Sequence, residues 1–145
     1  PMVDLSAPAF DLLAAPGHLI RRAQQQHQAR WTALVGSEIT SVQFAVLAKL
    51  AGEPGLDQNT LAGALSIDTS TLAEVCLRLA SRGLIDRERS AADARRYRLY
   101  LTGTGESVME RHTPAVDAVG EALLAPLTER ERRTLMRLLR RVIET

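Results

Sequence analysis

"LDQNTLAGALSIDTSTLAEVCLRLASRGLI", residues 56–85, has the pattern of two short helices joined by a tight turn. Leu61 and Leu65 give the first helix an apolar side, and residues 66–68 make the connection. Asp68 or Ser70 caps the second helix. Its apolar face carries Leu72, Val75, Cys76 and Leu79, and Gly83 ends it. Two short helices joined in this way form a helix-turn-helix.

A strongly basic hairpin follows the second helix. In RERSAADARRYRLYLTGTG, residues 87–105, twelve positions hold the five arginines Arg87, Arg89, Arg95, Arg96 and Arg98. Runs that start at Leu84–Ile85 and at Tyr97 flank a tight turn and are expected to pair as strands. A helix-turn-helix followed by such a hairpin is a winged helix.

Two further helices are predicted before this unit. Residues 16–35 carry apolar and aromatic side chains at spacings of three and four, which is typical of an amphipathic helix. In ITSVQF, residues 39–44, Thr40 and Gln43 form a capping box that begins the next helix. That helix is expected to stop at the GEPG turn, residues 52–55.

Two helices are also predicted after the hairpin. Thr102 or Thr104 caps a long helix, which Pro114 is expected to kink or interrupt. Thr128 and Glu131 form a second capping box that opens the last helix.

The predicted fold is therefore mainly α, with a small β-hairpin wing, in a single domain over residues 1–145. Residues of about 40–102 form the winged-helix region, and residues of about 10–36 and 103–145 form dimerisation helices. The outer helices carry apolar stripes that a central unit this small leaves uncovered. A second copy of the chain is the natural cover, so we expect a homodimer.

Composition limits the function classes. The formal net charge is only +1, so binding to a polyanion has to depend on local clustering of the 18 basic residues. A single cysteine, Cys76, excludes an intramolecular disulfide and a cysteine-based metal cage. No apolar run approaches a membrane span, and no segment resembles a signal peptide, so we expect a cytoplasmic protein without membrane contact.

These features resemble the MarR family of bacterial transcription regulators. The matching stretches are ITSVQFAVLAKL (39–50), the helix-turn-helix (56–85), DARRYRLYLTGTG (93–105) and LTERERRTLMRLLRRV (127–142). The resemblance implies a homodimer with one winged helix per subunit, each reading half of a pseudo-palindromic double-stranded DNA operator. It makes residues 68–82 the recognition helix. It also implies repression that is relieved by a small phenolic or aromatic acid.

The sequence departs from the family pattern at two places. Ala73 and Glu74 stand where the family often has a Thr-Arg pair in the recognition helix. Ala94 replaces the first arginine of the usual Asp-Arg-Arg motif of the wing. Neither change removes the fold.

Four polar residues of the recognition helix are candidates for DNA contact: Ser70, Thr71, Glu74 and Arg78. Ser70 and Thr71 lie near the helix N-terminus, where hydroxyl and backbone N–H groups favour phosphate. Glu74 can accept a hydrogen bond from cytosine, and Arg78 can reach guanine or phosphate. The alternative is an ordinary polar surface with a Glu74–Arg78 ion pair.

The wing supplies the other candidates for DNA contact. We expect Arg95 to enter the minor groove, with Asp93 holding its direction. Arg89, Arg96 and Arg98 are candidate phosphate contacts, which position a protein on DNA without reading sequence. The alternative for Arg95 is a solvated side chain at a loop tip.

A ligand site is proposed from His18, Arg22 and Phe44: His18 with Arg22, or with Arg21 in its place, would hold an anionic aromatic ligand, and Phe44 would form an apolar wall. The alternative is that these residues stabilise the dimer. His27 falls on an apolar stripe and is interpreted as a packed histidine, and Cys76 as a buried core residue instead of a redox sensor. The histidine spacing predicts no metal site, and nothing indicates a cofactor.

Catalytic motifs are missing from the sequence. It contains no glycine-rich phosphate loop, no nucleophile elbow and no distinctive carboxylate pair. A DNA-binding regulator that is not an enzyme is therefore the preferred hypothesis. The alternatives are a winged-helix protein-interaction module, a constitutive DNA-binding module without a ligand, and a small enzyme.

Overall fold

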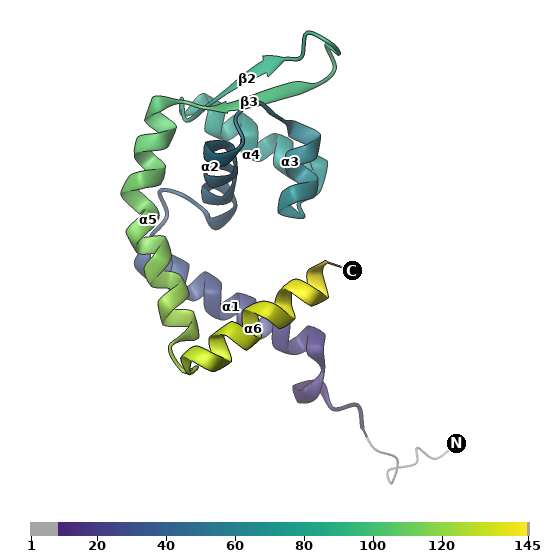
Figure 1. Ribbon diagram of the computed structural model, residues 1–145, viewed down its shortest axis with the longest axis vertical. Helices are drawn as coiled ribbons and strands as arrows, with labels where there is room; N and C mark the ends of the chain where they lie inside the picture. The colour runs from purple at the N-terminus through teal and green to yellow at the C-terminus, as the bar shows by residue number, and fades with distance from the viewer. Residues whose placement is uncertain (1–8, 145) are drawn as a thin grey trace, which may run out of the picture.

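The computed structural model describes residues 9–144, which form helices and one small sheet (Figure 1). The helices are α1 (Pro16–Leu34), α2 (Ser41–Gly52), α3 (Gln58–Leu65), α4 (Thr69–Ser81), α5 (Gly103–Leu124) and α6 (Glu129–Ile143), with a short 3-10 helix η1 (Leu12–Ala14). The strands are β1 (Leu56–Asp57), β2 (Ile85–Arg89) and β3 (Tyr97–Leu101). The mainly helical fold with a hairpin wing is thus confirmed.

The helix-turn-helix is α3, a short turn and α4. Asp57 caps α3 by accepting hydrogen bonds from the backbone of the first turn. Ser66 adopts a left-handed backbone, with φ 54°, and turns the chain between the helices. Asp68 then caps α4 by accepting from the Thr71 N–H at 3.1 Å, so Asp68 and not Ser70 is the N-cap. Hydrogen bonding to Thr71 lowers the pKa of the Asp68 carboxyl, because it stabilises the charged form.

The other predicted caps are also resolved. Thr40 with Gln43, and Thr128 with Glu131, form complete capping boxes at the starts of α2 and α6. Thr102, and not Thr104, caps α5 by accepting from the Gly105 N–H.

Of the two expected effects of Pro114, a kink or an interruption, the interruption does not occur, because α5 continues through it. Proline removes one N–H from the helix, whereas the packing of α5 against α1 and α2 supports the turns on either side. The axis of α5 does bend near its middle (Figure 1), as expected where a proline removes one hydrogen bond.

The sheet has the antiparallel order β1-β3-β2. In the hairpin, Ile85 pairs with Leu101 and Arg89 with Tyr97. The third strand, β1, was not predicted, because two residues cannot show an alternating pattern. It exists only through the pairing of Leu56 with Leu99 and of Asp57 with Arg98.

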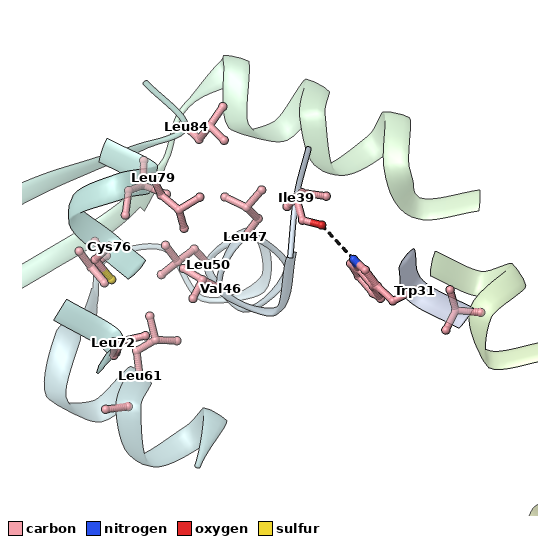
Figure 2. Close-up of a cluster of buried hydrophobic side chains, with 14 residues drawn as sticks. Trp31, Ile39, Val46, Leu47, Leu50, Leu61, Leu72, Cys76, Leu79 and Leu84 are labelled. Carbon is pink, nitrogen blue, oxygen red and sulfur yellow. Dashed lines mark hydrogen bonds between the residues drawn. The ribbon is translucent and has the colours of Figure 1, made fainter. Parts of the chain in front are cut away.

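The core lies between α2, α3, α4 and the base of the hairpin (Figure 2). Fully buried side chains from these elements include Leu47, Leu50, Leu61, Leu72, Leu79 and Leu99. Cys76 is among them, as predicted, and its burial raises the thiol pKa to about 11. Trp31 joins α1 to this core, because its indole N–H donates to the Ile39 carbonyl at 2.9 Å.

The outer helices leave apolar side chains uncovered. Before the winged helix these are Phe10, Leu12, Leu13, Leu19, Ile20 and Leu34; on α6 they are Met136, Leu138, Leu139, Val142 and Ile143. Over residues 9–144, no helix is both long and apolar enough to cross a membrane.

A close contact joins the hairpin to α5. The Thr102 hydroxyl donates to the Gly83 carbonyl at 2.6 Å, and the Thr102 N–H donates to the Leu84 carbonyl at 3.1 Å. Gly105, one turn into α5, lies against the same backbone, because a Cβ there would stand 2.0 Å from the Leu84 oxygen. Only glycine therefore fits at position 105.

Gly105→Ala should destabilise the fold strongly, because the added methyl group overlaps a backbone oxygen that cannot rotate away. We expect a loss of about 3 kcal/mol in the free energy of unfolding, measured by urea denaturation. Gly63→Ala is the matched control, since a Cβ at position 63 meets no described atom within 4 Å. The control should be neutral or stabilising by up to about 1 kcal/mol. Equal effects of the two substitutions would contradict the role of Gly105.

Candidate nucleic-acid interface

One face of α4 is polar and exposed. Ser70, Thr71, Glu74 and Arg78 all lie on it, opposite the buried residues of the same helix. The Ser70 hydroxyl donates to the Asp68 carboxylate at 3.1 Å, so it belongs to the cap as well as to the surface. The first turn of α4 thus presents hydroxyl and backbone groups at the positive end of the helix dipole.

Glu74 and Arg78 do not form the ion pair that was the alternative interpretation. Among the described residues neither has an ion-pair partner within 4.0 Å. Both side chains are therefore available to a partner molecule. Leu77, between Glu74 and Arg78 in the sequence, is 53% exposed. It is an apolar residue outside the buried face of α4.

The tip of the wing is organised by Asp93. Its carboxylate accepts from the Arg95 N–H at 3.0 Å and lies 3.7 Å from the Arg95 guanidinium Nε. The Arg95 side chain is 95% exposed. The predicted Asp93–Arg95 pairing is thus present, and it holds a fully solvated cation at the end of the hairpin.

Three other arginines of the wing, Arg89, Arg96 and Arg98, have partners within the chain. Arg96 lies 3.9 Å from Asp93 and 4.0 Å from Asp57. Arg98 donates to the Gly55 carbonyl at 3.4 Å. Arg89 donates to the Ala94 carbonyl at 3.2 Å. Each contact uses only part of an arginine's set of N–H donors, so it fixes the direction of the side chain and leaves donors free.

The three residues predicted to bind a ligand do not come together within one chain. Phe44 packs edge-on against Trp31, with ring centroids 6.1 Å apart. His18 lies thirteen positions before Trp31 on α1, which corresponds to about 20 Å along a helix axis. His18 is half-buried and Arg22 is exposed. One small ligand cannot reach all three residues in a single subunit.

A shallow concavity of about 450 Å³ lies along α6. Its lining residues are Leu127, Arg130, Glu131, Thr134, Leu135 and Leu138, none of which was predicted to bind a ligand. Within residues 9–144, no three metal-binding side chains gather into a possible metal site.

A polar contact that the sequence did not predict connects the α1–α2 loop to α5. Glu38 accepts a hydrogen bond from Arg111 and lies 3.3 Å from the His112 Nε2. More than seventy positions separate the partners, so no local pattern could reveal the contact. It joins the α1–α2 loop, just before the winged helix, to the middle of α5, away from Gly105.

Comparison with known proteins gives the same assignment at the level of sequence. The model of the MarR family matches residues 39–97. The transcriptional regulator HosA of Escherichia coli is 38% identical over 128 residues, which are 88% of this chain and 94% of that protein.

Solved structures extend the similarity to most of the chain. The PcaV transcriptional regulator from Streptomyces coelicolor, in complex with its natural ligand, has a TM-score of 0.89 and 43% identity, covering 96% of this chain and 99% of PcaV. The transcriptional repressor CouR, bound to a 23-mer DNA duplex, has a TM-score of 0.79 and 28% identity, covering 97% of this chain and 100% of CouR.

Proposed function

This chain belongs to the MarR family of transcription regulators, and we propose that it is a homodimeric repressor that binds a pseudo-palindromic double-stranded DNA operator. The observation that carries the proposal is that one chain exposes two elements suited to DNA. They are the polar face of α4 and the wing tip, where Asp93 lies next to the exposed Arg95. The proposal includes a cytoplasmic protein without enzymatic activity.

In this proposal α4 lies in the major groove. Thr71 and Ser70 contact phosphate at the start of the helix, while Glu74 and Arg78 face base edges. Arg95 enters the adjacent minor groove, and Arg89, Arg96 and Arg98 contact phosphates on either side. The absence of a Glu74–Arg78 ion pair in the described chain supports this assignment, because both groups are left for DNA.

The dimer is proposed to form through the uncovered apolar side chains of α6 and of the segment that leads into α1. Leu138 and Leu139 are both more than one-third exposed in the single chain, and α6 packs closely on no other described helix. Burial of these side chains against a second copy would remove apolar surface from water.

The effector is proposed to be a small aromatic or phenolic acid. PcaV has been solved with its natural ligand, which supports a ligand-responsive regulator. Because His18 and Phe44 are far apart in one chain, a pocket that uses both must combine His18 and Arg22 of one subunit with Phe44 of the other. A ligand that prefers the DNA-free arrangement of the dimer would release the operator.

Arg95→Ala should reduce binding to the operator more than binding to scrambled DNA, because its proposed contact depends on groove shape. Fluorescence anisotropy with a fragment from upstream of the chain's own gene, at several salt concentrations, measures both affinities. Arg78→Ala serves as the comparison on α4. Unchanged operator affinity in Arg95→Ala would show that the wing tip does not lie in a groove, and a chain that binds no DNA would favour a protein-interaction module.

Leu138→Glu should convert the dimer into monomer, because an unpaired carboxylate would be buried in the interface. Sedimentation velocity measures the association state. Arg137→Glu is the matched control, since it introduces the same group on the opposite face of α6. A stable dimer in Leu138→Glu would show that α6 is not the interface.

An aromatic carboxylate should raise the melting temperature of the protein and weaken operator binding, because it binds one state of the dimer preferentially. Benzoate derivatives, titrated in thermal-shift and anisotropy experiments, test this expectation. His18→Ala and Phe44→Ala should each abolish the response. An intact response in both variants would place the pocket elsewhere, and no response in the wild type would favour a constitutive DNA-binding module.

A further inference from the structure

Arg87 and Arg89 of β2 both lie over the ring of Tyr97 on β3. The guanidinium carbon of Arg87 is 4.1 Å from the ring centroid, and that of Arg89 is 5.6 Å from it. Arg89 pairs directly with Tyr97 in the hairpin, and Arg87, two positions earlier, pairs with Leu99 on the same face. Both distances fall within the range of cation–π attraction.

Arg87 differs from the other wing arginines because, within residues 9–144, its guanidinium has neither a hydrogen bond nor an ion pair. No carboxylate lies within 4.0 Å of it, and its buried Nε atom has no hydrogen-bond partner. Arg89, Arg96 and Arg98 each have a carbonyl or carboxylate contact. A buried donor without a partner is uncommon in folded proteins and calls for a specific explanation.

Arg87 is half-buried and lies close to elements that are proposed to contact DNA. Its strand neighbour across the hairpin, Leu99, is part of the buried core. The strand that carries Arg87, β2, packs against α4, so Arg87 lies on the part of the hairpin next to that helix. Both elements that meet there are the ones proposed to contact DNA.

Stacking on Tyr97 suits a cation that has to bind an anion. The attraction acts through the face of the guanidinium, whereas the N–H donors point outward in its plane. The ring therefore holds the group in place without occupying its donors. An ion pair with a carboxylate would instead have cancelled the charge.

We infer that Arg87 is a further DNA-phosphate contact, located between the recognition helix and the wing, and that Tyr97 is the residue that positions its guanidinium. The inference rests on the proposed function. It adds a residue to the interface and gives a role to an aromatic side chain that the sequence assigned to a strand alone.

The test measures operator binding by fluorescence anisotropy over a range of salt concentrations, with wild type, Arg87→Gln, Tyr97→Leu and Tyr97→Phe. Arg87→Gln should flatten the slope of log affinity against log salt by roughly two units per dimer, because one phosphate contact is lost in each subunit. Tyr97→Phe keeps the ring and should match the wild type. Tyr97→Leu should weaken binding on the order of tenfold per dimer, and should add no further loss in an Arg87→Gln background.

Several results would overturn the inference. An unchanged salt slope in Arg87→Gln would remove Arg87 from the interface while leaving the proposed function intact, whereas a wild type that binds no DNA would refute the proposed function itself. A full additional loss from Tyr97→Leu in the Arg87→Gln background would show that Tyr97 acts through something other than Arg87. Melting temperature and sedimentation are measured for each variant. If Arg87→Gln or Tyr97→Leu fails to fold, Arg87→Lys is the deciding variant, because it keeps the charge but loses the planar stack. It should bind the operator more weakly with an unchanged salt slope. Wild-type affinity in Arg87→Lys would refute the role of stacking.

Discussion

The contact between the first turn of α5 and the backbone of Gly83 and Leu84 is the constraint on which the rest of the structure depends. Thr102 donates two hydrogen bonds to that backbone, and Gly105 lets the helix approach it without a side chain between them. Because Gly83 ends α4 and Leu84 leads into β2, one small region sets the directions of the recognition helix, the wing and the long helix together. If this contact were packed more loosely, the recognition helix, the wing and the long helix could each still form. Their orientations relative to one another would no longer be fixed.

Local patterns predicted most of the fold because the helix ends are marked by side chains that act on their own backbone. The capping boxes at Thr40 and Thr128 needed nothing beyond the residues around them, and the structure contains both. Where the sequence left two candidates for an N-cap, such as Asp68 and Ser70, the structure shows which side chain accepts the backbone hydrogen bond. At α4 it is Asp68. The strand β1 and the continuation of α5 past Pro114 depend on partners far away in sequence, so they could not be predicted.

The candidate site shows the same division between local and distant information. The Asp93–Arg95 pairing spans two residues and was expected from spacing alone. The partners of Arg96 and Arg98 come from Asp57 and Gly55, about forty positions earlier. The number of arginines therefore predicted a basic wing. It could not predict which arginine the fold leaves without a hydrogen-bond or ion-pair partner. The separation of His18 from Phe44 likewise follows from helix length, which a list of side-chain types does not convey.

The length of α5 gives the molecule a mechanical property. Its 22 residues extend over about 33 Å at roughly 1.5 Å per residue, with the wing attached at one end and α6 following the other. The Glu38 contact with Arg111 and His112 lies near its middle, where it can serve as a fulcrum. Each end lies about 16 Å from this point, so a tilt of about 10° moves the end that carries the wing by about 3 Å, close to the roughly 3.4 Å rise of one base-pair step. Small rotations among the outer helices therefore produce displacements at the wing that are comparable with the spacing between base pairs.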